Sequence, residues 1–505
     1  MAKLTKRAFL TSVYNLAVVA AATSAFAACG GAATAPTAAP PPTVPPAPTT
    51  ATTQPTAAPQ PTAAPAPTSA PAKPTEAAQP TPAAAAAATS RQPFTITFMQ
   101  GRGEFSQVEE DTFNKKYAPL KVNMIENDYT HLAAMFAAKQ PPDVIRTYAP
   151  SIPGFKARNL ILDLTDYFKA SSKINTADLW EANDYYVFDP SSLKPSHTGL
   201  RYGMVKDFAP DNTLWIWKAS FDDAKVPLFE FDNPPSYADL LKLAPQLTKK
   251  DGSRTVRWGM QPSDFWIDRV TMAMVMEIGK SIYSDDYTKV LLKDDKDVRD
   301  AFKWYYDMAF SGSIPTKLNP IDDFVAGLIQ GRIAIFQNGY WHTAYLRLNE
   351  KPETHLDDNS RFIGAPWFFD KSKRVSPTVT AAGDVIAKAT KDPEATWTFF
   401  EYFMAEDPAL NRAKGGWGIP AYKSWFDRLP NDRPHEQRAL ATLKQEMPIM
   451  KTLNFNPYLG EDSVNQVWSA AIEKALRAST KADDMLDSVT TEINGLIQEG
   501  KDAIG

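Results

Sequence analysis

Strands and helices alternate at the start of the globular part of this chain, and this alternation restricts the fold more than any other feature. Residues 94–99 (FTITFM) have the pattern of a strand, and a helix running to about Tyr117 separates them from a second strand at 121–125. A short helix at 131–139 then leads to a third strand that opens at 143–145. The pattern predicts an α/β sheet, whose ligand sites lie beyond the carboxyl ends of its strands.

The first 90 residues are of a different kind. A basic N-terminus precedes an apolar run, and together they predict a secretory signal peptide at residues 1–28. Residues 29–92 are rich in Ala, Pro and Thr and almost uncharged, so they carry too few large apolar side chains to offset the entropy of an ordered chain. We expect this segment to be an extended, disordered linker.

The chain has one cysteine, Cys29, directly after the apolar run. A single thiol cannot form an internal disulfide. Its position after Phe26-Ala27-Ala28 resembles a bacterial lipobox, in which cleavage before the cysteine leaves an N-terminal residue that carries lipid. The sequence therefore predicts an extracytoplasmic protein that is lipid-anchored to the cell membrane. The basic residues do not decide between the general export route and a twin-arginine-like one.

Charge and motif content argue against several function classes. A formal net charge of −4 favours neither nucleic acid nor an acidic membrane surface as a partner. The five histidines show no HExxH spacing, and the sequence has no GxSxG motif and no phosphate-binding glycine loop. Adjacent acidic pairs such as Asp222-Asp223 resemble surface pairs, although a sugar cleft with two acids could belong to a glycosidase. We therefore expect a protein that is not an enzyme and uses no cofactor or metal, with a tethered polysaccharide-degrading enzyme as the less favoured alternative.

One stretch, residues 331–346 (GRIAIFQNGYWHTAYL), combines a strand, a break and a helix. The apolar run 333–336 has strand character, Asn338-Gly339 interrupts it, and helical spacing resumes afterwards. Tyr340 and Trp341 lie at the junction between the predicted strand and the predicted helix. Aromatic side chains at a loop tip would expose a large apolar surface unless a ligand or another part of the protein packs on them. Two core aromatics at a helix start are the alternative interpretation.

Several further segments carry motifs whose order and spacing matter more than any one of them. They are AKQPPDV (138–144), KASFDDAKVP (218–227), PPSYADL (234–240), LTKKDG (247–252), FVAGLIQGRIAIFQNGYW (324–341), AAGDVIAK (381–388), DPEATWTFFEYF (392–403) and GGWGIP (415–420). This series resembles the extracellular solute-binding proteins of the sugar type, the maltose-type substrate-binding lipoproteins of ABC transporters. The chain departs from the family pattern at Gln140, Trp217 and Lys225.

The resemblance implies an α/β, two-lobed periplasmic-binding-protein-like fold with crossover hinge segments and a ligand cleft between the lobes. The N-terminal lobe would comprise residues 93–208 and about 376–413, and the C-terminal lobe about 209–375 and 414–505. It also implies a monomeric receptor that binds a sugar or oligosaccharide and delivers it to the transmembrane subunits of an ABC permease. A solute-binding protein for a peptide, polyamine or phosphate ester is the alternative.

Sugar clefts need aromatic platforms and hydrogen-bonding side chains, because a buried hydroxyl without a partner costs about 1–3 kcal/mol. Trp341 matches the family's stacking tryptophan after Asn-Gly. The ligand-binding residues that the resemblance implies are Gln100, Glu104, Tyr148, Asp207, Asp264, Phe265, Trp266, Tyr340, Trp341, Asp384 and Trp417. Loop carboxylates can instead be solvated or cap helices, and we expect Asp143 to be structural. The pattern does not decide which of Trp215 and Trp217 faces the cleft.

Overall fold

The computed structural model describes residues 91–101, 104–263, 266–378 and 380–504. The predicted signal peptide, Cys29, almost all of the predicted linker, and the candidate residues Asp264 and Phe265 lie outside the described residues. The chain divides into two units, Met1–Thr81 and Pro82–Gly505, and all of the described residues belong to the second.

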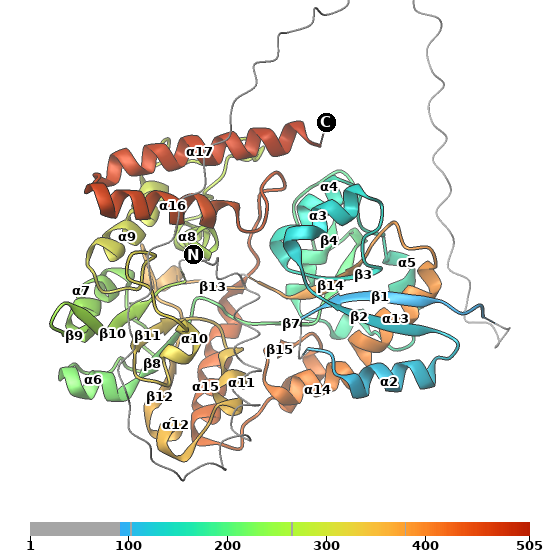
Figure 1. Cartoon of the computed structure of the whole chain (residues 1–505), viewed down its shortest axis with the longest axis horizontal. Helices are drawn as coiled ribbons and strands as arrows, with labels where there is room; N and C mark the ends of the chain where they lie inside the picture. The colour runs from blue at the N-terminus through green and yellow to red at the C-terminus, as the bar shows by residue number, and fades with distance from the viewer. Residues whose placement is uncertain (1–90, 102–103, 264–265, 379, 505) are drawn as a thin grey trace, which may run out of the picture. The chain divides into compact units, whose positions relative to one another are not determined.

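The first sheet has five strands in the order β2-β1-β3-β14-β6, and it is drawn on the right of Figure 1. Its strands are β1 (Thr95–Gln100), β2 (Lys121–Glu126), β3 (Val144–Thr147), β6 (Gly203–Val205) and β14 (Gly383–Ile386). β1 runs parallel to β2 and β3, whereas β14 returns much later in the sequence and pairs antiparallel with β3 and β6. The α/β sheet expected from the alternating pattern is therefore present.

Aromatic side chains fill the core on one face of this sheet. Phe98 of β1 lies 4.8 Å from both Phe399 and Phe403 of helix α13, measured between ring centroids. Asp392 caps α13 (Pro393–Ala405) by accepting the Ala395 N–H at 2.9 Å, as the Asp-Pro start predicts. The other helices of this part are α2 (Gln107–Lys116), α3 (Tyr129–Ala137), α4 (Ile152–Ala157), α5 (Thr165–Ala170) and α14 (Asp407–Gly415).

The second sheet also has five strands, in the order β12-β8-β11-β10-β9. They are β8 (Leu214–Trp217), β9 (Lys249–Asp251), β10 (Arg254–Gln261), β11 (Ile333–Gln337) and β12 (Ser360–Ile363). Only β10 and β11 are parallel; the other neighbours are antiparallel. Its helices are α6 (Lys218–Ala224), α7 (Tyr237–Leu247), α8 (Ile267–Met276), α9 (Lys296–Phe310), α10 (Phe324–Gly327), α11 (His342–Leu348), α12 (Leu356–Asn359), α15 (Pro434–Glu446), α16 (Ser463–Ala478) and α17 (Ala482–Asp502).

Helix α10 is a short element between Asp323 and Gly331. Asp323 caps its start, accepting the N–H groups of Val325 and Ala326. After it, the Arg332 N–H bonds to the Gly327 carbonyl and Gly331 takes a φ of 65°. This is a Schellman-type ending, in which a glycine in the left-handed region stops the helix and releases the chain into β11.

Three connections run between segments of the two sheets. The first contains β7 (Asp207–Phe208), the second β13 (Ser376–Pro377), and the third β15 (Ile419–Pro420). β7 pairs with β15, and β13 pairs with β16 (Met450–Lys451). The buried carboxylate of Asp211 joins the first two connections by accepting the Thr380 N–H at 3.2 Å and its hydroxyl at 3.0 Å.

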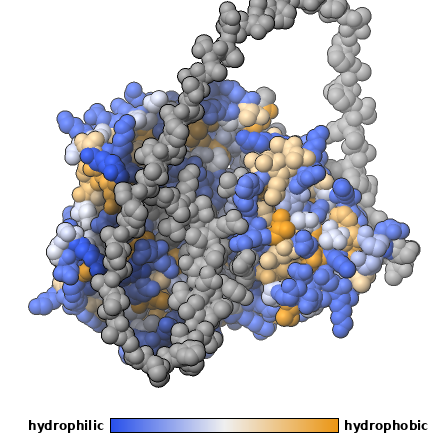
Figure 2. All heavy atoms as spheres, in the orientation of Figure 1, coloured by the Kyte–Doolittle hydropathy of each residue, from blue (hydrophilic) through white to orange (hydrophobic). Residues whose placement is uncertain are grey.

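Hydrophilic residues cover most of the described surface drawn in Figure 2, with hydrophobic residues in smaller patches. Large exposed hydrophobic side chains are few and scattered along the sequence, and include Val108, Leu348 and Trp417. Within the described ranges, no helix has the length and apolar character needed to cross a bilayer.

Candidate functional site

Five of the candidate residues gather where strands of the first sheet end. Gln100 is the last residue of β1 and Glu104 follows in the next loop, while Tyr148 comes directly after β3. Asp384 lies in β14 between β3 and β6, and Asp207 follows β6. The sheet order therefore brings together side chains that are up to 284 positions apart, as in the 3.4 Å hydrogen bond from Gln100 Nε2 to Asp384 Oδ1.

Two basic residues that the sequence interpretation did not select hold this cluster together. Arg146 of β3 donates two parallel bonds to Glu104, Nε to Oε2 at 2.8 Å and Nη2 to Oε1 at 2.9 Å. Lys206 Nζ lies 3.2 Å from Glu104 Oε2 and 2.5 Å from Asp207 Oδ2. Burial alone would raise the pKa of Glu104, but the charges of Arg146 and Lys206 outweigh it and lower that pKa to about 2. Glu104 is thus ionised at neutral pH.

The pKa of Asp384 is shifted in the opposite direction to that of Glu104. Asp384 is fully buried, and burial raises its pKa to about 7 although Lys206, Arg412 and Arg146 act to lower it. Arg412 of α14 is 8% exposed, and its Nη2 donates to the Phe403 carbonyl at 3.0 Å. Among the described residues, Asp384 Oδ2 and Arg412 Nε and Nη1 have no hydrogen-bond partner. Unpaired buried groups of this kind are concentrated at functional sites.

The candidate aromatic residues of the second sheet differ in burial. Trp341 is half-buried and stands at the start of α11, whereas its neighbour Tyr340 is fully buried and packs edge-on against Phe362. Trp266 is 6% exposed at the start of α8, and Trp417 is 36% exposed after α14. Trp215 and Trp217 are both buried, so alternation along β8 does not leave either of them open.

The break before Trp341 has a clear packing reason. A Cβ atom at Gly339 would lie 2.2 Å from Asp211 Oδ1, so only glycine fits there. Trp215 Nε1 donates to the Gly339 carbonyl at 3.0 Å, and the Thr213 hydroxyl donates to the Asn338 carbonyl at 2.7 Å. These bonds attach the turn to the first connection and to β8, and they set the starting point of α11.

Two sets of contacts link candidate residues, and the second of them joins the two sheets. Asp207 pairs with Pro420 in the β7–β15 ladder, and Gly418, next to Trp417, packs on Asp207. On the other side, Arg269 lies 5.9 Å from the Trp266 ring and donates to the Glu461 carbonyl at 3.3 Å. Ser151, three positions after Tyr148, donates to the Glu461 carboxylate at 3.1 Å.

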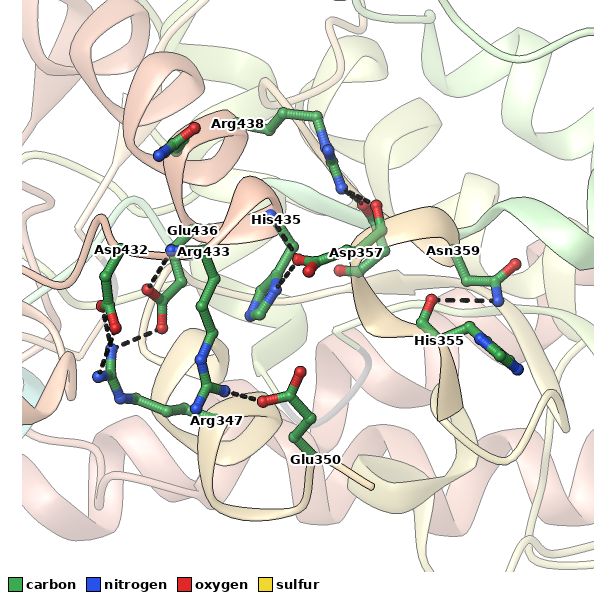
Figure 3. A network of polar contacts seen from close by, with 12 residues as sticks. Arg347, Glu350, His355, Asp357, Asn359, Asp432, Arg433, His435, Glu436 and Arg438 are labelled. Carbon is green, nitrogen blue, oxygen red and sulfur yellow. Dashed lines mark hydrogen bonds and ion pairs between the residues drawn. The ribbon is translucent and has the colours of Figure 1, made fainter. Parts of the chain in front are cut away.

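A polar network holds α11, the helix that follows Trp341, in place (Figure 3). Arg347 Nη1 donates to Asp432 Oδ1 at 2.9 Å and to Glu436 Oε1 at 2.7 Å. His435 Nδ1 lies 2.8 Å from Asp357 Oδ1. The network joins α11 and α12 to the start of α15 and pairs its charges internally, so we assign it a structural role.

His342 is enclosed by aromatic side chains immediately after Trp341. Its ring stacks on Tyr345 at 5.3 Å and lies 5.5 Å from Trp215 and 5.3 Å from Phe336, measured between centroids. Neither ring nitrogen has a hydrogen-bond partner among the described residues. Burial lowers the pKa of His342 to about 3, so the folded protein keeps this ring neutral.

This burial predicts a loss of stability in acid that His342→Phe should remove. In the unfolded chain His342 titrates near 6.5, so protons bind the unfolded state preferentially between pH 6.5 and about 3. Lowering the pH from about 7.5 to about 5 should therefore reduce the free energy of unfolding by about 2 kcal/mol more in the natural protein than in His342→Phe. Urea unfolding at both pH values measures this difference. His131→Gln, at an exposed histidine, should retain the natural acid sensitivity, and an equal sensitivity in His342→Phe would contradict the prediction.

The adjacent acidic pairs do not form a catalytic pair. Asp223 binds Arg257 at 2.9 Å and Lys249 at 3.1 Å, and Asp286 accepts from Ser284 and Thr288. Asp295 binds Lys280 and caps α9. In the described part of the chain, no group of three His, Cys, Asp or Glu side chains is placed to hold a metal ion.

The cluster around Glu104 also shows what the sequence interpretation missed. Arg146, Lys206 and Arg412 lie in or beside regular elements, and the resemblance assigns no role to them. A useful signal was present in β3, because an arginine inside the apolar strand VIRT must find a buried partner.

Known protein families and solved structures include proteins similar to this chain. The family model described as "Bacterial extracellular solute-binding protein" matches residues 111–433. The ABC substrate-binding protein Lmo0181 from Listeria monocytogenes, solved in complex with cycloalternan, aligns with a TM-score of 0.65 and 17% identity over 80% of this chain and 98% of its own. The sugar-binding protein MalE from Xanthomonas citri aligns with a TM-score of 0.60 and 16% identity over 80% and 98%.

The maltose/maltodextrin-binding domain MalE from Bdellovibrio bacteriovorus, bound to maltotriose, aligns with a TM-score of 0.61 and 14% identity over 80% of this chain and 100% of its own. No protein with a curated description matches the chain significantly. At these identities the solved structures show a shared fold, and the α/β, periplasmic-binding-protein-like architecture expected from the motifs is confirmed.

Proposed function

The chain belongs to the bacterial extracellular solute-binding proteins, and we propose that its solute is a sugar or oligosaccharide that it delivers to an ABC importer. Membership of this family makes it a binding receptor and not an enzyme. The choice of a sugar is supported most by one observation. A cluster of hydrogen-bonding side chains at the strand ends of the first sheet is linked through residues 207–211 to the turn that carries the half-buried Trp341.

The charges of the cluster fit a neutral, polyhydroxylated solute. Glu104 and Asp207 are paired with Arg146 and Lys206, so these four charges cancel among themselves. Such a site offers donors and acceptors in fixed positions without needing a charged ligand to balance it. An aromatic ring supplies the apolar surface on which a sugar face can stack. The ligands bound in two similar structures, cycloalternan and maltotriose, support the same class of solute.

We further propose that the segments 93–208 and 376–413 form one lobe and the segments 209–375 and 414–505 the other. The connections containing β7, β13 and β15 would act as the hinge, with solute binding favouring a closed state that docks on the permease. Cleavage before Cys29 and its lipidation would anchor the protein, and residues 29–92 would form the tether. Incorporation of labelled fatty acid, and its loss in Cys29→Ser, tests the anchor.

The decisive experiment is a binding panel on the purified protein. Glucose, maltose, maltotriose and cycloalternan would be titrated by calorimetry and by intrinsic tryptophan fluorescence, beside a peptide, a polyamine and a phosphate ester. We expect saturable binding of at least one sugar and none of the other compounds. Binding of only a non-sugar compound would overturn the sugar assignment and leave the receptor class intact. Steady turnover of a glycoside, lost on replacing one carboxylate, would overturn the receptor assignment itself.

A further inference from the structure

We infer that Arg146 is the positioning residue of the solute site, holding the Glu104 carboxylate and the Tyr148 ring in fixed relative orientation. The inference rests on the proposed function and adds to it a residue outside the contact loops. Arg146 is 7% exposed and lies in the middle of the first sheet. It pairs with Asp384 in the β3–β14 register, so its backbone is held on one side by a strand that arrives from the far end of the sequence.

The guanidinium group uses all three of its nitrogens on two partners. Nε and Nη2 make the parallel pair of bonds to Glu104, and Nη1 donates to the Tyr129 hydroxyl at 3.1 Å. A planar fork that binds both oxygens of a carboxylate fixes its rotation as well as its position. Glu104 lies in a loop, and among the described residues the other cation that contacts its carboxylate is Lys206, a single ammonium that cannot fix its rotation.

The same group also covers one side of Tyr148. The Arg146 Cζ atom lies 4.5 Å from the Tyr148 ring centroid, within the range of a cation–π contact. The centroid of the Tyr129 ring lies 6.0 Å from the centroid of the Tyr148 ring, and the two ring planes make an angle of 45°. Because the cation occupies one face of the Tyr148 ring, a sugar cannot stack on that face. Arg146 therefore contacts both a hydrogen-bonding group, Glu104, and an aromatic surface, Tyr148, and fixes their relative positions. These are the two elements that a sugar site needs.

Arg146 also determines the charge state of Glu104. The cations that act on Glu104 include Arg146, Lys206 and Arg412, and the acidic groups near them include Asp207, Asp384 and Glu109. The tyrosines that interact with Arg146 include Tyr129, Tyr148 and Tyr186, and Glu461 acts on Tyr129. Burial opposes ionisation of Glu104, and Arg146 gives the largest of the effects that lower its pKa. Removing Arg146 should therefore raise this pKa toward the range in which binding is measured.

The test uses Arg146→Met, Arg146→Lys and a matched control. Between about pH 6 and about 4.5 Asp384 stays largely protonated and Glu104 ionised in the natural protein, so affinity for maltotriose, or for the tightest sugar of the panel, should be flat over that range. Arg146→Met should bind roughly tenfold more weakly at the higher pH and roughly tenfold more weakly again at the lower one. Arg146→Lys should restore the flat profile but only part of the affinity, because one ammonium cannot make the paired bonds. Arg257→Met, at a buried arginine of β10 in the second sheet, should keep both affinity and profile.

A second readout does not depend on any sugar. Carboxyl ¹³C NMR of the ligand-free protein should show Glu104 titrating at higher pH in Arg146→Met than in the natural protein, with the resonance assigned by Glu104→Gln. If no sugar binds the natural protein, the proposed function fails while this titration still decides the role of Arg146. An unchanged Glu104 titration, or unchanged affinity in either Arg146 variant, would overturn the inference. If Arg146→Met does not fold, Arg146→Gln, which also lacks the charge, replaces it in both measurements.

Discussion

Trp341→Ala is expected to weaken sugar binding by roughly ten- to a hundredfold and to leave the protein folded. The indole is half-buried, at the first residue before α11, while the packing of the turn comes from its neighbours. Trp215 bonds the Gly339 carbonyl, and Tyr340 fills the core. The substitution should thus remove a stacking surface worth about 1.5–3 kcal/mol without removing what holds α11 in place.

Calorimetry with the tightest sugar of the panel measures the loss, and circular dichroism with thermal unfolding checks the fold. Trp425→Ala is a suitable control, because Trp425 is also partly buried but packs on Tyr422 beside the first sheet's core. It should lose some thermal stability and keep its affinity. A folded Trp341→Ala protein with unchanged affinity would mean that Trp341 is a core aromatic, like Tyr340.

Local patterns in the sequence predicted several of the regular elements. The strands β1, β2, β3 and β11 and the helices α2, α3 and α11 appear within a few residues of their expected positions. Caps and periodicity explain this success, because a residue such as Asp392 acts on backbone groups only three positions away. The α/β fold followed from the alternating pattern together with the ordered motifs.

The arrangement of the site could not be predicted in the same way. Glu104 and Arg146 are 42 positions apart, and Gln100 and Asp384 are 284 apart, so no local pattern joins them. Adjacent residues of one chemical kind also had different outcomes, since Tyr340 is in the core while Trp341 is half-buried. Tertiary packing decides such cases, and here it is the approach of Asp211 to Gly339 that sets the turn.

Asp384→Asn is expected to stabilise the protein above neutral pH. The pKa of Asp384 is raised from 3.8 to about 7, so the folded protein holds this proton more tightly than the unfolded chain does. The resulting destabilisation is absent below about pH 4, grows as the pH rises toward 7, and is complete above that value. At about pH 8 the variant should therefore be more stable than the natural protein by about 4 kcal/mol, with little difference at about pH 4.

Urea unfolding at the two pH values measures this effect, and Asp286→Asn provides the opposite case. Side-chain bonds from Ser284 and Thr288 lower the pKa of exposed Asp286 to about 2, so its neutralisation should not stabilise the protein at any pH. Asparagine at 384 can still accept the hydrogen bond from Gln100. A stability gain that is equal at both pH values would show that the Asp384 pKa is not raised. A gain at pH 8 accompanied by weaker sugar binding would mean that this buried carboxylate is kept for the site at the expense of stability.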